Sequence, residues 1–212
     1  ATSGSANTYS LHFDGESGVF GSGDVVEVND FNTNYQEVTV AAWIKADLTI
    51  NSDKWMNIVD TNYEHSFVPY RLALIQNSVR FGFQNGGGGS DIFAPYAQFE
   101  YTDTESWNYI TGIREFEAGL YTLKLFINGE LVDSVTTAID PDLSQTNQTI
   151  GIGSSTRQDY EYIRGNIDNL YIFNRALSQS EIQAYMTSDL TGDEESLAGY
   201  WKFNAGQDSL LY

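Results

Sequence analysis

The sequence predicts an all-β fold, namely an antiparallel β-sandwich of two sheets with one short C-terminal helix. Apolar and polar residues alternate with a period of two along many short segments, as in strands that place one face in a core. Aromatic residues make up 14% of the 212 residues, which supplies enough apolar surface for such a core. Only one segment combines a helix-capping sequence with apolar residues at helical spacing.

The two clearest strands lie in residues 38–45 and 123–127. In the first, the even-numbered side chains are apolar and share one face, whereas the odd-numbered ones, Trp43 among them, face the other way. The second runs into Asn128-Gly129, a pair that favours a tight hairpin turn. Further strands are expected at residues 9–13, 25–28, 56–60, 70–75, 79–84, 109–113, 149–152 and 166–173. The alternation in the last of these is imperfect, which a β-bulge would explain.

A single helix is predicted to begin after Ser178. Ser178 and Glu181 have the spacing of a capping box, in which the hydroxyl and the carboxylate each accept a hydrogen bond from a backbone amide at the helix start. Ile182, Tyr185 and Met186 then fall on one helical face, which we expect to pack on the sandwich.

Charge and composition exclude several classes of function. The chain carries 29 acidic and 10 basic side chains, a net charge of −19, so its surface repels nucleic-acid phosphates and anionic membranes. The absence of cysteine excludes disulfides, thiolate metal sites and cysteine nucleophiles. No run of about 18 apolar residues is present, so no transmembrane helix is expected.

Five segments, in this order, resemble the laminin G-like, concanavalin A-like jelly-roll family of bacterial extracellular proteins. They are residues 11–15 (LHFDG), 39–45 (TVAAWIK), 107–112 (WNYITG), 125–131 (LFINGEL) and 165–178 (GNIDNLYIFNRALS). The resemblance extends over roughly residues 9–187, and the last segment is its most specific motif. It implies two antiparallel sheets, one of them concave, a secreted or cell-surface location, and a place in a larger multidomain protein.

The resemblance also sets the expected domain organisation. We expect one laminin G-like domain over residues 1–212, with the core sandwich at residues 8–187. Residues 188–196 are rich in carboxylates and are expected to be a solvated linker. Residues 197–204 resemble a strand that completes such a sheet, although they would also fit the first strand of a following repeat.

The resemblance implies a structural calcium ion. In this family the aspartate of Phe-Asp-Gly and that of Ile-Asp often hold Ca²⁺, and these correspond to Asp14 and Asp168. Calcium takes six to eight oxygen ligands, so backbone carbonyls and water would have to complete the site. The alternative is that Asp14 only caps a turn before Gly15 and that Asp168 only solvates a strand.

Members of this family often bind glycans on one face or rim of the sandwich. Sugar recognition needs flat aromatic side chains for C–H faces and planar polar groups for hydroxyls, and two loop-rich regions are rich in both. The predicted glycan-binding residues are Trp55, Tyr63, His65, Tyr70, Arg71, Arg80, Gln84, Arg157, Tyr160 and Tyr162. Trp43 and Trp107 are family framework positions and are expected in the core.

Catalysis is not expected, although glycoside hydrolases and polysaccharide lyases share this fold. Retaining hydrolysis needs two carboxylates about 5–5.5 Å apart, and the chain lacks the Glu-x-Asp-x-x-Glu pattern that supplies them. We therefore expect a non-catalytic carbohydrate-binding or adhesion module that binds a polysaccharide or a cell-surface glycan. The alternative is a protein-interaction or spacer module of an adhesin that has no sugar site.

Overall fold

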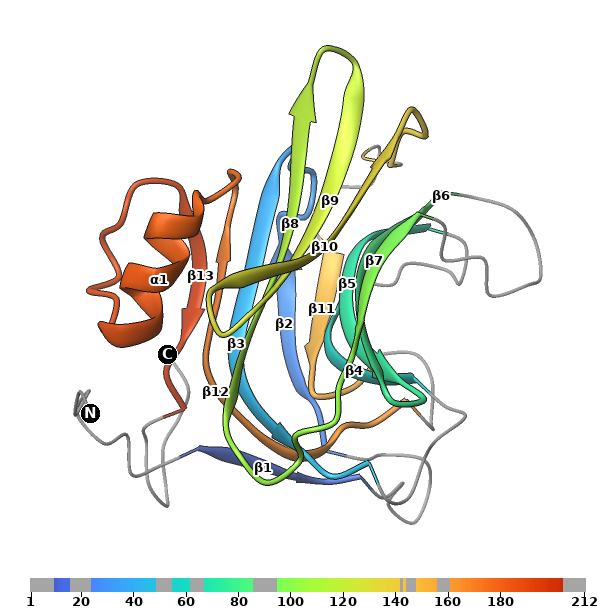
Figure 1. Cartoon of the computed structure of the whole chain (residues 1–212). Helices are drawn as coiled ribbons and strands as arrows, with labels where there is room; N and C mark the ends of the chain where they lie inside the picture. Colours follow the sequence, from blue (N-terminus) through green and yellow to red (C-terminus); the bar gives the residue numbers. More distant parts are fainter. Residues whose placement is uncertain are drawn as a thin grey trace.

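The computed structural model describes residues 10–15, 24–48, 55–61, 67–85, 95–141, 143, 148–155 and 161–203. Its strands form two antiparallel sheets packed face to face, with one helix beside them (Figure 1). The seven-stranded sheet has the order β1 (Leu11–Asp14), β12 (Arg164–Phe173), β3 (Val38–Ala46), β8 (Asn108–Glu117), β9 (Leu120–Ile127) and β10 (Glu130–Thr137), and β13 (Leu197–Trp201) also pairs with β12. The six-stranded sheet has the order β2 (Val26–Phe31), β11 (Gln148–Ile152), β4 (Trp55–Asp60), β5 (Phe67–Ile75), β6 (Ser78–Asn85) and β7 (Tyr96–Glu100).

The core between the sheets follows from the period-two alternation. In β3 the even-numbered side chains from Val38 to Ile44 are fully buried, and Phe81 and Phe83 of β6 meet them from the other sheet. Packing there is tight, because a Cβ on Gly112 would lie 2.2 Å from the Phe81 ring. These observations confirm the antiparallel sandwich that the sequence predicts.

The period-two alternation predicts one irregularity of the strands, a bulge, and misses one short strand. The register between β12 and β3 shifts between Asp168 and Tyr171, and Asn169 there has a φ of 46°, which confirms the expected bulge. Strand β7 was not expected. It is a short edge strand that pairs only with β6 among the described strands, and its side chains are mostly half-buried or exposed, so its alternation is weak.

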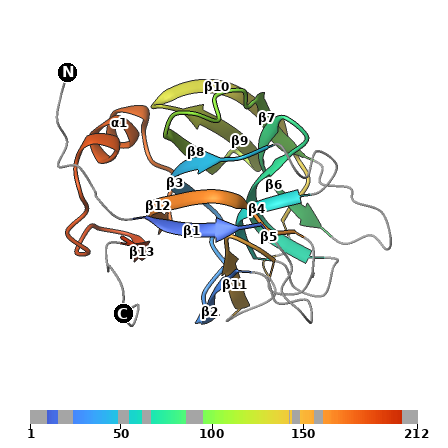
Figure 2. The ribbon, with the colours of Figure 1, turned by 90° about the horizontal axis from the view of Figure 1, so that it is seen from below.

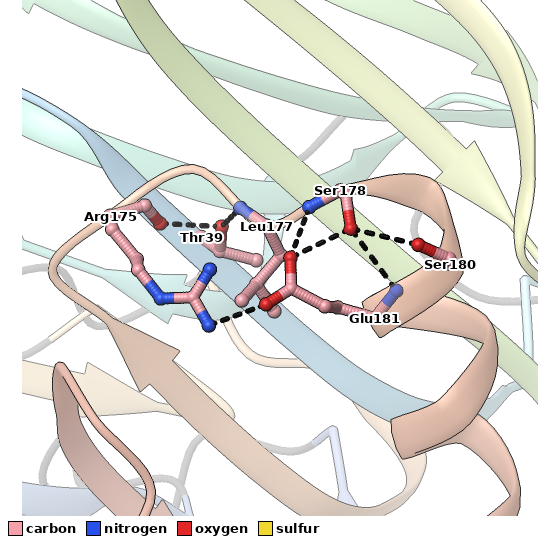
Figure 3. A network of polar contacts seen from close by, with 6 residues as sticks. All are labelled: Thr39, Arg175, Leu177, Ser178, Ser180 and Glu181. Atoms are coloured by element: carbon pink, nitrogen blue, oxygen red, sulfur yellow. Dashed lines mark hydrogen bonds and ion pairs between the residues drawn. The ribbon is translucent and has the colours of Figure 1, made fainter.

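Helix α1 (Gln179–Thr187) begins with the predicted capping box. The Ser178 hydroxyl accepts from the Glu181 amide at 3.3 Å, and the Glu181 carboxylate accepts from the Ser178 amide at 2.8 Å (Figure 3). Glu181 also pairs with Arg175 at 2.7 Å. The Thr39 hydroxyl donates to the Arg175 carbonyl and accepts from the Leu177 amide, which fixes the start of the helix to β3.

The helix covers part of the outer face of the seven-stranded sheet. Both views place α1 beside that sheet, on the side away from β4, β5 and β6 (Figures 1 and 2). Ile182 is fully buried there, in a second apolar cluster with Ala41, Phe173 and Leu177 that is separate from the core. No helix in the described part of the chain is long and apolar enough to cross a membrane.

Candidate functional site

A pocket of about 280 Å³ lies on the outer face of the seven-stranded sheet, between β3, β8 and β12 on one side and α1 with the following segment on the other. We call it the α1 pocket. It is lined by Trp43, Trp107, Tyr109, Asp168, Asn169, Tyr171, Tyr185, Met186, Thr187, Ser188, Asp189, Leu190 and Tyr200. Six of these thirteen residues are aromatic, which is typical of a small-ligand site.

Strand register brings the aromatic side chains of the pocket together. Trp43 of β3 lies directly opposite Tyr109 of β8 and Asp168 of β12. The ring centroids are 5.2 Å apart for Trp43 and Tyr109, 6.3 Å for Tyr109 and Tyr171, and 6.0 Å for Tyr171 and Tyr185 of α1. The rings therefore form a continuous aromatic surface from the sheet to the helix, within the centroid range of favourable aromatic pairs.

Two of the tyrosines that line the pocket have buried hydroxyl groups. Tyr109 and Tyr171 are only 1% and 2% exposed, and neither phenolic oxygen has a hydrogen-bond partner among the described residues. Burial raises the pKa of Tyr171 well above its usual value, so this hydroxyl stays protonated. Because both oxygens are fully buried, Tyr109 and Tyr171 contribute their rings to the pocket wall rather than hydrogen bonds to a ligand.

The polar part of the pocket wall is rich in hydrogen-bond acceptors. Asp168 accepts from the Asn169 amide at 2.9 Å, and the Asn169 side-chain oxygen accepts from the Tyr200 hydroxyl at 3.3 Å. Burial, together with the nearby carboxylates of Asp189 and Asp168, raises the pKa of Tyr200 to about 12. Trp107 lies at the pocket with 39% of its surface exposed, so its ring is accessible to a ligand.

A second aromatic cluster lies on the outer face of the six-stranded sheet. We call it the Trp55 face, and it comprises Trp55, Asn57, Asp60, Arg71, Arg80, Gln84 and Tyr96. The guanidinium groups of Arg71 and Arg80 lie 5.4 and 5.6 Å from the Trp55 ring centroid, and that of Arg80 also lies 4.6 Å from the Tyr96 ring centroid. Trp55 is only 9% exposed. Its ring is thus covered by cations, in cation–π geometry.

Buried polar groups surround Arg71 on this face. Its Nε lies 2.9 Å from Asp60 and its Nη2 lies 3.8 Å from Glu161, and both carboxylates are almost fully buried. The Asn57 side-chain amide donates to Glu161 at 2.9 Å. The second carboxylate oxygen of Asp60, the Asn57 oxygen and the Nε of Arg80 are buried and make no hydrogen bond to the residues that the structure describes.

The structure brings together only some of the predicted glycan-binding residues. Trp55, Arg71, Arg80 and Gln84 share the outer face of the six-stranded sheet, since Gln84 and Arg80 alternate with the buried Phe81 and Phe83. The remaining described residues are buried, and four predicted residues lie outside the described part of the chain. These four are Tyr63, His65, Arg157 and Tyr160.

Tyr70 and Tyr162 were predicted to face a ligand, and the structure corrects both predictions. Tyr70 is fully buried in the core, because neighbouring residues of a strand face opposite ways and Arg71 takes the outer face. Tyr162 is 5% exposed, although its sequence neighbours are polar. Its segment packs back on the sandwich, where the Ile163 amide donates to the Gly153 carbonyl at 2.8 Å.

The structure separates the two predicted calcium ligands. Asp14 pairs with Arg164, and Asp168 lies four residues further along β12, or about 13 Å at ~3.3 Å per residue. Two short aspartate side chains and two Ca–O bonds of about 2.5 Å each cannot bridge that distance. Asp14 and Asp168 therefore do not fit a shared calcium site, and no group of three or more His, Cys, Asp or Glu residues in the described part of the chain is placed to hold a metal.

Sequence reasoning missed the two tryptophans of the α1 pocket, because it assigned Trp43 and Trp107 to the core. The structure shows instead that both line the pocket. One signal was available for Trp43, which is out of phase with the buried even-numbered residues of β3. Nothing local predicts Trp107, because it precedes β8 and its position depends on where α1 docks.

Comparisons with known proteins agree with the architecture. The family model described as concanavalin A-like lectin/glucanases superfamily matches residues 20–183. Among curated proteins none matches the chain. A heptameric SAP-like pentraxin from Limulus polyphemus is similar in structure, with a TM-score of 0.62 and 12% identity over 89% of this chain and 87% of that one.

Two further solved structures are similar to this chain. The CBM40 of a Ruminococcus gnavus IT-sialidase, bound to α2,3-sialyllactose, has a TM-score of 0.56 and 16% identity over 78% of this chain and 97% of that one. The binding domain of botulinum neurotoxin DC, in complex with SialylT, has a TM-score of 0.55 and 19% identity over 78% of this chain. The match spans only 40% of that neurotoxin chain. At these identities the likeness shows the fold alone.

Proposed function

Because the chain belongs to the concanavalin A-like lectin/glucanases superfamily, we propose that it is a non-catalytic carbohydrate-binding module and that the α1 pocket is its glycan site. One observation carries this proposal: the pocket places the exposed Trp107 ring and the half-buried Trp43 ring beside the polar side chains of Asp168, Asn169 and Asp189. Such a module would act in a secreted or cell-surface protein, where it holds a larger protein against a polysaccharide or a cell-surface glycan.

The chemistry of the pocket suits a sugar ring. The exposed Trp107 and the half-buried Trp43 offer flat faces against which the C–H groups of a pyranose can pack. Asn169, Asp168 and Asp189 line the pocket and offer oxygens to sugar hydroxyls. The volume of about 280 Å³ is at the small end of ligand pockets, which suits one or two sugar units rather than a long chain.

The fold neighbours support a glycan as the ligand class. One of them is a carbohydrate-binding module bound to sialyllactose, and another is a neurotoxin binding domain in complex with SialylT. A single site of this kind is expected to bind weakly, with Kd values between about 1 mM and 1 μM. Tandem copies in a longer protein would raise the overall affinity through avidity.

A glycan array followed by titration of the hits tests the proposal. Trp107→Ala is expected to weaken binding about tenfold or more, with the free energy of unfolding changed by about 0.5 kcal/mol or less because the side chain is exposed. Phe99→Ala is the matched control, since Phe99 is a similarly exposed aromatic residue of β7 that does not line the pocket. Isothermal titration calorimetry and chemical denaturation supply the two measurements.

The other outcomes identify the alternatives. A hit that survives Trp107→Ala but is lost with Arg80→Ala would move the site to the Trp55 face, as the sequence predicts. An array without hits across neutral, basic and acidic glycans would favour the protein-interaction or spacer module.

A further inference from the structure

The wall of the α1 pocket carries charge of one sign. Asp168 and Asp189 contribute carboxylates, and none of the described residues that line the pocket is basic. Asp168 is only 6% exposed, so its charge acts through a medium less polar than bulk water. The net charge of −19 on the whole chain adds a negative long-range potential. An anionic ligand is therefore disfavoured in this pocket.

The aromatic surface of the pocket favours a cation for a separate reason. The faces of tryptophan and tyrosine rings carry partial negative charge and attract ammonium groups within about 6 Å of the ring centroid. Trp43, Trp107 and Tyr185 present such rings next to the two carboxylates. Aromatic faces combined with carboxylates are the environment in which a desolvated ammonium group is best stabilised.

One ammonium group of the chain already lies between an aromatic ring and a carboxylate, at the edge of the pocket. The Nζ of Lys202 lies 5.4 Å from the Tyr200 ring centroid and 3.8 Å from the Asp189 carboxylate. Lys202 itself does not line the pocket, and its side chain is 42% exposed. The Tyr200 ring and Asp189 therefore already bind a primary ammonium group at the rim of the pocket. The rest of the pocket wall also contains aromatic rings and a carboxylate.

We infer that the α1 pocket selects sugars that carry a protonated amino group over neutral, N-acetylated and acidic sugars. The inference rests on the proposed function for the sugar ring and adds the ligand class. The ammonium group donates to Asp168 or Asp189 and lies against the aromatic faces. An acidic sugar such as sialic acid would instead place its carboxylate against Asp168 and Asp189.

Four probes separate the sugar from the charge: glucosamine tetramer, its fully N-acetylated form, the neutral tetramer cellotetraose, and tetramethylammonium, which has the charge without the sugar. Each is titrated at about 0.15 M salt and at a pH where the amine is protonated, with calorimetry and tryptophan fluorescence as readouts. We expect the glucosamine tetramer to bind at least tenfold more tightly than the other two sugars and tetramethylammonium to compete with it.

Charge variants show whether the preference arises in the pocket. Asp189→Asn is expected to lower the preference for the amino sugar severalfold and to leave the fold intact, because Asp189 is exposed. Asp168→Asn is expected to lower it more, and it keeps the oxygen that accepts from the Asn169 amide. Asp193→Asn is the control, since it removes the same charge from an exposed residue of the same segment that does not line the pocket.

The outcomes separate this inference from the proposed function. Equal binding of all three tetramers would overturn the charge selectivity and leave the carbohydrate-binding proposal standing. Binding of tetramethylammonium without binding of any sugar would overturn both the amino-sugar inference and the carbohydrate-binding function. An equal loss of preference in Asp193→Asn would also overturn the inference, because attraction to the overall charge would then explain the binding.

Discussion

The α1 pocket and the Trp55 face lie on the outer faces of the two opposite sheets, yet their tryptophan rings differ in exposure. In the α1 pocket the Trp107 ring is exposed, and an internal cation, Lys202, lies only at the rim, over Tyr200 and beside Asp189. On the Trp55 face two guanidinium groups cover the ring of Trp55, and Asp60 and Glu161 already pair with Arg71. A tryptophan on an outer face therefore suits ligand binding where its own ring is exposed and is not covered by an internal cation.

The two regions also differ in where their charged groups lie. On the Trp55 face the buried carboxylates of Asp60 and Glu161 surround Arg71, and this network ties β4, β5 and residue 161 together. In the α1 pocket Asp168 and Asp189 lie in the wall of an open volume. The first arrangement mainly stabilises the sheet, whereas the second places acceptors where a ligand can bind.

Removal of Arg71 should give the largest effect and would test the structural role of the Trp55 face. Arg71→Met leaves the fully buried Asp60 and the nearly buried Glu161 without their cation, so we expect a loss of about 3–5 kcal/mol in the free energy of unfolding. Arg80→Met is the matched control. No ion pair of Arg80 is found among the described residues, and its loss should cost about 1 kcal/mol or less.

Urea denaturation of the two variants gives the measurement. If both lost the same small amount, the Arg71 network would not stabilise the sheet. The Trp55 face would then regain its place as a candidate ligand surface.

Low pH should weaken the cap of α1, the helix that forms one wall of the α1 pocket. The hydrogen bond from Arg175, together with those from the amide and hydroxyl of Ser178, lowers the pKa of Glu181 from its usual 4.5 to about 2. A carboxylate with a lowered pKa in the folded state contributes stability that is fully present above about pH 4.5 and is lost as the pH falls towards 2. The side chain is about one third exposed, so solvent screening keeps this contribution modest.

We therefore expect Glu181→Gln to flatten part of the decline in the free energy of unfolding between pH 4.5 and 2. Glu27→Gln, which changes an exposed carboxylate of β2 away from the helix, is the control and should leave that decline unchanged. Chemical denaturation at several pH values measures both. Parallel curves for Glu181→Gln and the wild type would show that the cap does not hold α1 over the pocket.

The smallest effect is expected from a double-mutant cycle on Asp14 and Asp168 with calcium present. The two residues lie about 13 Å apart along the sheet, so the stability changes of Asp14→Asn and Asp168→Asn should add within about 0.5 kcal/mol. Thermal or chemical denaturation of the wild type, the two single variants and the double variant gives the four corners of the cycle, which is measured once with calcium and once with a chelator. A coupling of more than about 1 kcal/mol that disappears with the chelator would restore the shared calcium site.

Much of the fold was predictable, because strand and cap signals are local. The alternation in residues 38–45 identifies which side chains of β3 enter the core, and Ser178 with Glu181 identifies the helix start. The slip in residues 166–173 even locates the bulge near Asn169. The alternation also indicates that Tyr70 and Arg71 cannot both lie on the outer face, because they are neighbours in one strand and face opposite sides.

The site was much less predictable than the fold. Trp55, Arg71 and Arg80 do lie together, but their own contacts cover the ring that the ligand was expected to use. A search by residue type finds such a cluster and cannot tell whether its members bind one another. Asp168 shows the same limit, since its motif suggested a metal ligand and its position places it in the wall of a pocket.

The sequence by itself determined the two-sheet sandwich, the capped helix and the net charge of −19, because each depends on near neighbours in the chain or on composition alone. Tertiary structure decided the candidate site. Trp43, Tyr109, Tyr171 and Tyr200 come from four strands and meet only through the register of β3, β8, β12 and β13. The pocket exists because α1 docks over one outer face and leaves part of it open, and packing between distant segments sets that position.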